Sequence, residues 1–159
     1  MKRSVLPILL AAALGLLPFA GEGRSRSGKE GCWSRTSPAV NQCHIFEGEI
    51  NKRGKPVGFH SRPGGRNPPD ARVVRILDGP NRLGVYVARV EIQDREKTSS
   101  LFPDSMDRAA VLQAVLRAYR DRTTGDSIKF RGPSGRGFTI EGYLLNDGRI
   151  NTAYPIYTD

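Results

Sequence analysis

The two histidines of this chain, His44 and His60, are the side chains best suited to proton transfer near neutral pH. They stand sixteen residues apart, and the turn signal Asn51-Lys52-Arg53-Gly54 lies between them. Strands over residues 44–50 and 56–60 would form a hairpin that sets the two histidines opposite each other, with Cβ atoms about 5 Å apart. Such a pair can cleave RNA through its own 2′-hydroxyl, one imidazole acting as base and the other as acid. The alternative is two unrelated surface histidines.

Three further side chains are candidates for completing this centre. Lys97 precedes the predicted long helix, and lysines are scarce here, so it is the candidate cation that stabilises charge on phosphorus. The alternative is a solvated strand end. Thr152 and Tyr154 alternate along the last predicted strand and therefore share a face. A hydroxyl beside an aromatic ring can hold one nucleotide; the alternative is an edge strand with a buried tyrosine, which Pro155 also fits.

Cys32 and Cys43 are the cysteines of the chain, and an even number in an exported protein favours a disulfide. The bond would close a short loop before His44 and stabilise the fold by on the order of 2–3 kcal/mol. A zinc site of two cysteines and two histidines is disfavoured, because strand neighbours such as Cys43 and His44 point to opposite faces. We expect no cofactor, and no acidic cluster has the character of a dedicated metal site.

The elements that must position these residues are mostly strands. Beyond the hairpin, period-two patterns and turn signals predict strands over residues 72–77, 84–93, 127–131, 137–145 and 149–157. In the second of these segments the apolar residues fall on one face, namely Tyr86, Ala88, Val90 and Ile92. Residues 61–70 are rich in Pro, Gly and Arg and are predicted to form a loop.

One long helix is predicted over Met106–Arg120, with Asp104 or Ser105 as its cap and Gly125 closing it. Its apolar stripe consists of Leu112, Val115, Leu116 and Tyr119. Strands on both sides of a single helix predict an α+β fold with mostly antiparallel sheet and one long central helix.

The N-terminal residues have the pattern of a secretory signal peptide. Lys2 and Arg3 precede an apolar run over residues 5–17, which is shorter than the roughly 20 residues of a transmembrane helix. The alternative is a buried N-terminal helix. The expected regions are a signal peptide over 1–20, cut between 20 and 23, a flexible linker over 21–31, and one domain over 32–159. We therefore expect export to the periplasm or the medium, with no stable membrane anchor.

The chain of 159 residues carries a formal net charge of +9, and +7 once Lys2 and Arg3 are removed. This charge favours phosphate backbones or anionic surfaces as partners, and the excess of arginine over lysine favours bidentate phosphate contacts. Arginines that could position phosphates are Arg62, Arg66, Arg72, Arg131 and Arg136. The alternative is charge that serves only solubility.

Four stretches between residues 43 and 156 carry a further pattern. They are HIFEGEI with GFH (44–50 and 58–60), KTSSLFP (97–103), GFTIEGY (137–143) and TAYPI (152–156). In order and spacing they resemble the bacterial branch of the EndoU-type endoribonucleases. The resemblance implies a compact α+β fold shared with bacterial ribonuclease toxins.

The same resemblance implies a catalytic centre of His44, His60 and Lys97, completed by Thr152 and Tyr154. By the resemblance His60 would be the base and His44 the acid; by residue type alone, either histidine could take either role. Thr152 would contact the RNA base and Tyr154 the sugar, and the product would be a 2′,3′-cyclic phosphate.

We therefore expect a secreted, monomeric endoribonuclease that cleaves single-stranded RNA or tRNA as an interbacterial toxin. An acidic immunity protein that covers the basic face would be its partner in the producing cell. The alternative is a non-catalytic basic module that binds nucleic acid or an envelope surface, with binding that collapses with salt and ignores the histidines.

Overall fold

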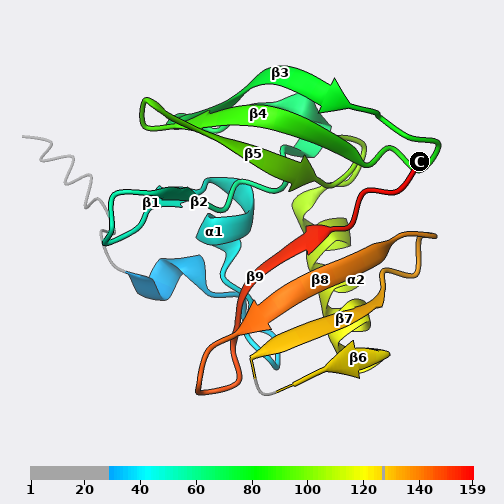
Figure 1. Cartoon of the computed structure of the whole chain (residues 1–159). Helices are drawn as coiled ribbons and strands as arrows, with labels where there is room; N and C mark the ends of the chain where they lie inside the picture. The colour runs from blue at the N-terminus through cyan, green and yellow to red at the C-terminus, as the bar shows by residue number, and fades with distance from the viewer. Residues whose placement is uncertain (1–28, 127) are drawn as a thin grey trace, which may run out of the picture.

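A computed structural model of the chain describes residues 29–126 and 128–159; the predicted signal peptide and most of the predicted linker lie outside them. Figure 1 shows a three-stranded sheet above a four-stranded sheet, with a small helix and a short hairpin at the side between them. Both sheets are antiparallel and there is one main helix, so the predicted α+β class is confirmed. Within the described ranges, no helix is long and apolar enough to cross a membrane.

The N-terminal elements are short. They are the 3-10 turn η1 (Lys29–Cys32), helix α1 (Gln42–Phe46), strands β1 (Glu49–Ile50) and β2 (Pro56–Val57), and the 3-10 turn η2 (Pro63–Gly65). The strand predicted over residues 44–50 is wrong in its first part, because His44 belongs to α1. The helix forms because the Asn41 side chain accepts a hydrogen bond from the His44 amide at 3.2 Å, which caps its first turn. Only the last two residues of the predicted strand, β1, pair with β2.

The upper sheet contains β3 (Ala71–Asp78), β4 (Tyr86–Ile92) and β5 (Arg95–Leu101) in that order. The alternation predicted for β4 is confirmed, since every second side chain is buried. Strand β5 is not among the predicted elements. It follows a two-residue turn at Gln93 and Asp94, whose φ angles of 46° and 62° are positive without glycine. Lys97 therefore lies inside a strand and not in a segment that leads into the helix.

Helix α2 (Arg108–Arg120) begins later than predicted. Its cap is Asp107, whose carboxylate accepts a hydrogen bond from the Ala110 amide at 2.7 Å, so neither Asp104 nor Ser105 caps it. Gly125 does not close the helix but belongs to strand β6 (Thr124–Gly125). The predicted stripe is displaced by part of a turn: the buried line is Val111, Ala114, Val115 and Ala118, and Leu112, Leu116 and Tyr119 flank it.

The lower sheet has the order β6, β7 (Lys129–Pro133), β8 (Thr139–Leu144) and β9 (Ile150–Pro155). One face packs on α2 through β7 and β8, whose buried side chains include Phe130 and Ile140. Strand β9 is the edge of this sheet, next to strand β5 of the upper sheet (Figure 1). Thr152 and Tyr154 alternate with buried Ala153, so their side chains stand on the face that α2 does not cover.

The described residues form two hydrophobic clusters. The lower one joins α1, α2 and the lower sheet, and the upper one joins Phe59 to the inner face of the upper sheet. The predicted Cys32–Cys43 disulfide is present. It closes a loop in which Val40 forms a parallel bridge to Ile150, so this loop ties α1 to strand β9. We call the parts around these clusters the lower and upper halves.

Candidate active site

The two histidines lie together because their backbones touch. The Phe59 amide donates to the His44 carbonyl at 2.8 Å, and the His60 amide donates to the Ile45 carbonyl at 2.7 Å. Gly58 makes this approach possible, since a Cβ there would meet the His44 carbonyl oxygen at 2.2 Å. The ring centroids are 6.3 Å apart. The predicted proximity is therefore present, but a contact between helix α1 and the irregular segment after β2 produces it and not two opposed strands.

His60 is held in one tautomer by the upper half. Its Nδ1 lies 3.0 Å from the Ser100 carbonyl oxygen, which can only accept, so Nδ1 carries the proton. The Ser99 hydroxyl, 3.0 Å from the same nitrogen, donates its own proton to the Phe59 carbonyl. Burial lowers the pKa of His60 well below 6.5, and the Lys97 charge lowers it further. Near pH 7 the ring is thus neutral, with its lone pair on Nε2.

His44 faces a carboxylate instead. Its Nδ1 donates to Glu49 Oε1 at 3.2 Å. Burial lowers the pKa of His44 below 6.5, and the hydrogen bond and charge of Glu49 oppose that decrease. Both Nδ1 atoms are therefore tied to acceptors, and among the described residues no hydrogen bond uses either Nε2 atom.

Lys97 supplies a cation beside the histidines. Its ammonium donates to the Gly58 carbonyl at 2.8 Å and lies 3.4 Å from the Ser99 hydroxyl. Burial lowers the pKa of Lys97 to about 8, so the group remains mostly charged at pH 7. The cation shares Ser99 with His60, which places it in the same network.

Strand β9 brings Thr152 and Tyr154 to the same place. The Tyr154 ring lies 5.2 Å from the His60 ring, and its hydroxyl donates to Glu141 on β8. Thr152 Oγ1 is buried and has no hydrogen-bond partner among the described residues, so a ligand could supply one. The Ser100 hydroxyl donates to the Pro155 carbonyl and thereby joins β5 to β9. Ser100 thus orients His60 with its carbonyl and holds the tyrosine strand with its hydroxyl.

The loop after His60 is fixed by an ion pair between Arg62, which was predicted to position phosphates, and Asp104, which was predicted to cap the helix. Arg62 binds Asp104 with two hydrogen bonds of 3.1 and 2.8 Å, and Tyr86 donates to the same carboxylate at 2.7 Å. Asp104 is therefore an anchor for this loop and not a helix cap. Arg62 is engaged in this structural role, and Arg72 is likewise paired, with Glu91.

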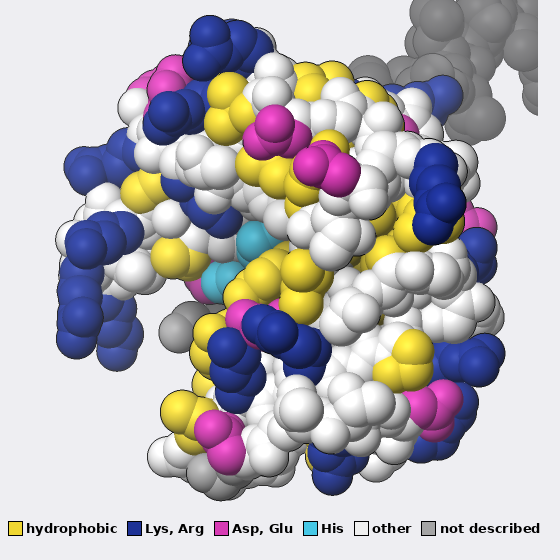
Figure 2. Space-filling view, turned by 45° about the vertical axis from the view of Figure 1, so that its right-hand side comes forward, with side chains coloured by type: hydrophobic (Ala, Val, Ile, Leu, Met, Phe, Trp, Pro, Cys, Tyr) yellow, Lys and Arg dark blue, Asp and Glu magenta, His cyan; other side chains and the backbone are white. Residues whose placement is uncertain are grey.

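The two histidines lie at the bottom of a hollow between the upper and lower halves, as Figure 2 shows. Each is 7% exposed. Lys and Arg side chains stand at the mouth of the hollow and below it in this view. We call these Lys and Arg side chains the basic rim of the hollow. A histidine pair at this depth can shield most of a bound phosphodiester from water, while the positive charges of the rim attract its phosphate.

Four residues in this network were missed by sequence reasoning: Glu49, Ser99, Ser100 and Glu141. Strand alternation over 44–50 would place Glu49 on the opposite face from His44, so it gave no signal for this pair. The serines act partly through main-chain atoms, which leave no trace in residue type. Within residues 29–126 and 128–159 no group of three or more His, Cys, Asp or Glu side chains could hold a metal ion.

Known proteins that are similar to this chain identify its family. The chain is 32% identical over 117 residues to a protein named Toxin from Bacillus cereus (strain ATCC 14579), a match that covers 70% of this chain. It covers 21% of that relative, so this chain spans about a fifth of its length. No solved structure gives a significant match. A model of the bacterial EndoU nuclease family matches residues 39–157, which include all five predicted site residues. The chain therefore belongs to the bacterial EndoU nuclease family.

Proposed function

We propose that the protein is an endoribonuclease that cleaves RNA by attack of its 2′-hydroxyl on the adjacent phosphate. One observation carries this proposal. Two buried imidazoles lie 6.3 Å apart between ring centroids, and each Nδ1 is bound to an acceptor. Their Nε2 atoms remain for a substrate, and this spacing suits one phosphodiester between a base and an acid.

The environments of the two rings support different roles. Burial and the Lys97 cation both lower the pKa of His60, so its neutral form can accept a proton. The Glu49 carboxylate favours the protonated form of His44, so this ring is the better acid. We therefore assign His60 as general base and His44 as general acid.

The reaction moves two protons and exchanges one phosphorus–oxygen bond for another. His60 Nε2 takes the 2′-hydroxyl proton as the 2′-oxygen bonds to phosphorus. The bond from phosphorus to the 5′-oxygen breaks, and His44 Nε2 donates its proton to that oxygen. The Lys97 ammonium stabilises the extra negative charge on the phosphoryl oxygens. The products are a 2′,3′-cyclic phosphate and a 5′-hydroxyl end.

The remaining two residues hold the nucleotide that carries the attacking hydroxyl. The buried Thr152 hydroxyl, which lacks a partner in the described residues, would bond the base edge. The Tyr154 ring, beside His60, would pack on the sugar. This arrangement sets the 2′-hydroxyl next to the base that removes its proton.

We further propose that the enzyme acts as an exported toxin on single-stranded RNA or tRNA. The relative named Toxin, the N-terminal signal-peptide pattern and the disulfide support this role. An acidic immunity protein over the basic rim of the hollow would protect the producing cell.

The experiment is incubation of the purified protein with tRNA, followed by a denaturing gel and mass spectrometry of the fragment ends. We expect fragments that end in a 2′,3′-cyclic phosphate. His60→Ala and His44→Ala should each lower the cleavage rate by about 10²- to 10⁴-fold, because each removes a proton-transfer group. Arg82→Gln is the control, because Arg82 is exposed in the turn before β4. This variant should cleave at the wild-type rate.

Intact RNA in all buffers tested, or cleavage at the wild-type rate by both histidine variants, would disprove the proposal. Salt-dependent RNA binding without cleavage, unchanged in both variants, would identify the protein as a basic binding module instead.

A further inference from the structure

The outer face of the lower sheet continues away from the active site as two rows of side chains. Strand register pairs Thr152 with Tyr143 and Tyr143 with Lys129 in one row. It pairs Tyr154 with Glu141 and Glu141 with Arg131 in the other. Neighbouring strands lie about 4.8 Å apart, so each row leads stepwise outward from the nucleotide held by β9.

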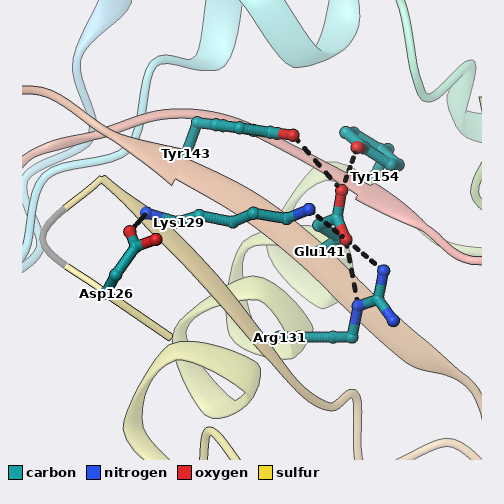
Figure 3. Close-up of polar contacts among 6 residues, drawn as sticks. All are labelled: Asp126, Lys129, Arg131, Glu141, Tyr143 and Tyr154. Atoms are coloured by element: carbon teal, nitrogen blue, oxygen red, sulfur yellow. Dashed lines mark hydrogen bonds and ion pairs between the residues drawn. The ribbon is translucent and has the colours of Figure 1, made fainter. Parts of the chain in front are cut away.

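The outer positions of these rows combine one aromatic ring with two cations. Tyr143 is 36% exposed although it is a large ring in the middle of a sheet. The Lys129 ammonium lies 5.6 Å from the centre of that ring and 3.1 Å from Glu141 Oε2. Figure 3 shows Tyr143 and Tyr154 reaching toward the Glu141 carboxylate, while Lys129 and Arg131 approach it from the neighbouring strand.

Glu141 organises this cluster. Burial alone would raise its pKa, yet hydrogen bonds from Tyr154, Arg131 and Lys129 lower that pKa to about 2, so the carboxylate is ionised. One carboxylate faces two cations, which leaves one excess positive charge beside an exposed ring. The carboxylate also holds the Tyr154 hydroxyl, and so it links the outer cluster to the active site.

We propose that Tyr143, Lys129 and Arg131 form a second nucleotide subsite, which binds the nucleotide on the 5′ side of the one held by Thr152 and Tyr154. The inference rests on the proposed ribonuclease function. A base would stack on the exposed Tyr143 ring, and the phosphate between the two nucleotides would meet Lys129 and Arg131. Stacking of this kind tolerates any base, because every base has a π-face.

The direction follows from the position of Tyr154. Its ring lies 5.2 Å from His60, the proposed base, so the nucleotide beside it carries the attacking 2′-hydroxyl. The leaving 5′-oxygen belongs to the next nucleotide toward His44. A chain that continues across β8 and β7 is therefore the part on the 5′ side of the attacking nucleotide.

The test compares three RNA substrates that share one cleavable step: a dinucleotide, a trinucleotide extended at its 5′ end, and a trinucleotide extended at its 3′ end. The 5′ extension should raise kcat/KM of the wild-type enzyme about 5- to 20-fold over the dinucleotide. Tyr143→Ala should remove most of that gain, and Tyr143→Phe should keep it, because the ring remains. Lys129→Gln should lower the gain and its dependence on salt.

Arg82→Gln serves as the matched control for a lost surface charge. Equal slowing of the dinucleotide and the 5′-extended trinucleotide by Tyr143→Ala would overturn the subsite, as would a wild-type enzyme that gains nothing from the 5′ extension. Failure of the ribonuclease proposal is a different result, since the wild-type enzyme would then cleave none of the three substrates and no tRNA.

Discussion

The upper and lower halves of the molecule contribute different kinds of group to the candidate active site. The upper half supplies Lys97 and the serines that orient His60, all from strand β5. The lower half supplies His44 from α1 and the Thr152 and Tyr154 side chains from β9. The proposed base and cation thus depend on one hydrophobic cluster, whereas the proposed acid and the nucleotide platform depend on the other.

Because of this division, substitutions in the two halves should change different properties of the site. Substitutions in the upper half should act on the chemical step, and substitutions on the sheet of the lower half should act on the bound nucleotide. Ser100 connects the two halves by hydrogen bonds. Its carbonyl accepts one from His60, and its hydroxyl donates one to the carbonyl of Pro155, next to Tyr154.

Apart from the histidine variants, the largest effect is expected in the upper half at Lys97. Lys97→Met removes the buried cation, and kcat should fall by about 10²- to 10³-fold with little change in KM, because the charge is needed most in the transition state. Steady-state kinetics on a short RNA measure both constants. Lys55→Met, an exposed lysine in the β1–β2 turn, is the control. A raised KM with unchanged kcat would assign Lys97 to substrate binding and contradict the proposed division of roles between the two halves.

An intermediate effect is expected in the lower half at Thr152. Thr152→Val keeps the shape but removes the hydroxyl, so kcat/KM should fall about tenfold through the lost bond to the base. The melting temperature should stay or rise, because the buried Thr152 Oγ1 has no partner in the described structure. Thermal unfolding and kinetics with different bases measure both. Thr139→Val, on an exposed position of β8, should change neither, and a lower melting temperature for Thr152→Val would contradict the assignment.

The smallest effect is expected at Glu49, and it appears in the pH profile. Activity needs neutral His60 and protonated His44, so it rises with pH as His60 loses its proton and falls as His44 does. Glu49→Gln removes the charge that favours protonated His44, so the pKa of His44 should decrease further. The alkaline limb of kcat/KM against pH should shift to lower pH, with a few-fold loss at pH 7.

The acid limb should stay in place in this variant, because His60 titrates there and its largest influences are burial and Lys97. Glu47→Gln, an exposed carboxylate beside Arg108, is the control. A shift of the acid limb instead of the alkaline limb would reverse the proposed roles of the two histidines.

The sequence predicted the parts of this protein that depend on repeating patterns. The alternation in β4 and the long helix are both present, because they bury one face along many residues. Helix α1 was missed because five residues are too few to show helical periodicity, and its formation depends on a single cap from Asn41. Strand β5 was missed because its turn at Gln93 and Asp94 lacks glycine and its residues are polar.

The predicted site residues lie together, but the groups that prepare them for chemistry could not be predicted. The orientation of His60 depends on a main-chain carbonyl of Ser100, which any residue at that position would present. Asp104 resembles a helix cap in sequence, yet Arg62 and Tyr86 bind it from distant segments. Such partners follow from tertiary contacts and not from local spacing.

The main-chain contact between residues 44–45 and 59–60 also has a dynamic consequence. Two backbone hydrogen bonds, of 2.8 and 2.7 Å, bind the helix that carries His44 to the segment that carries His60. The two segments therefore fluctuate as one body, and their amide hydrogens should exchange with solvent in a single opening event. The distance between the proposed acid and the proposed base is then preserved through the thermal motions of the surrounding loops.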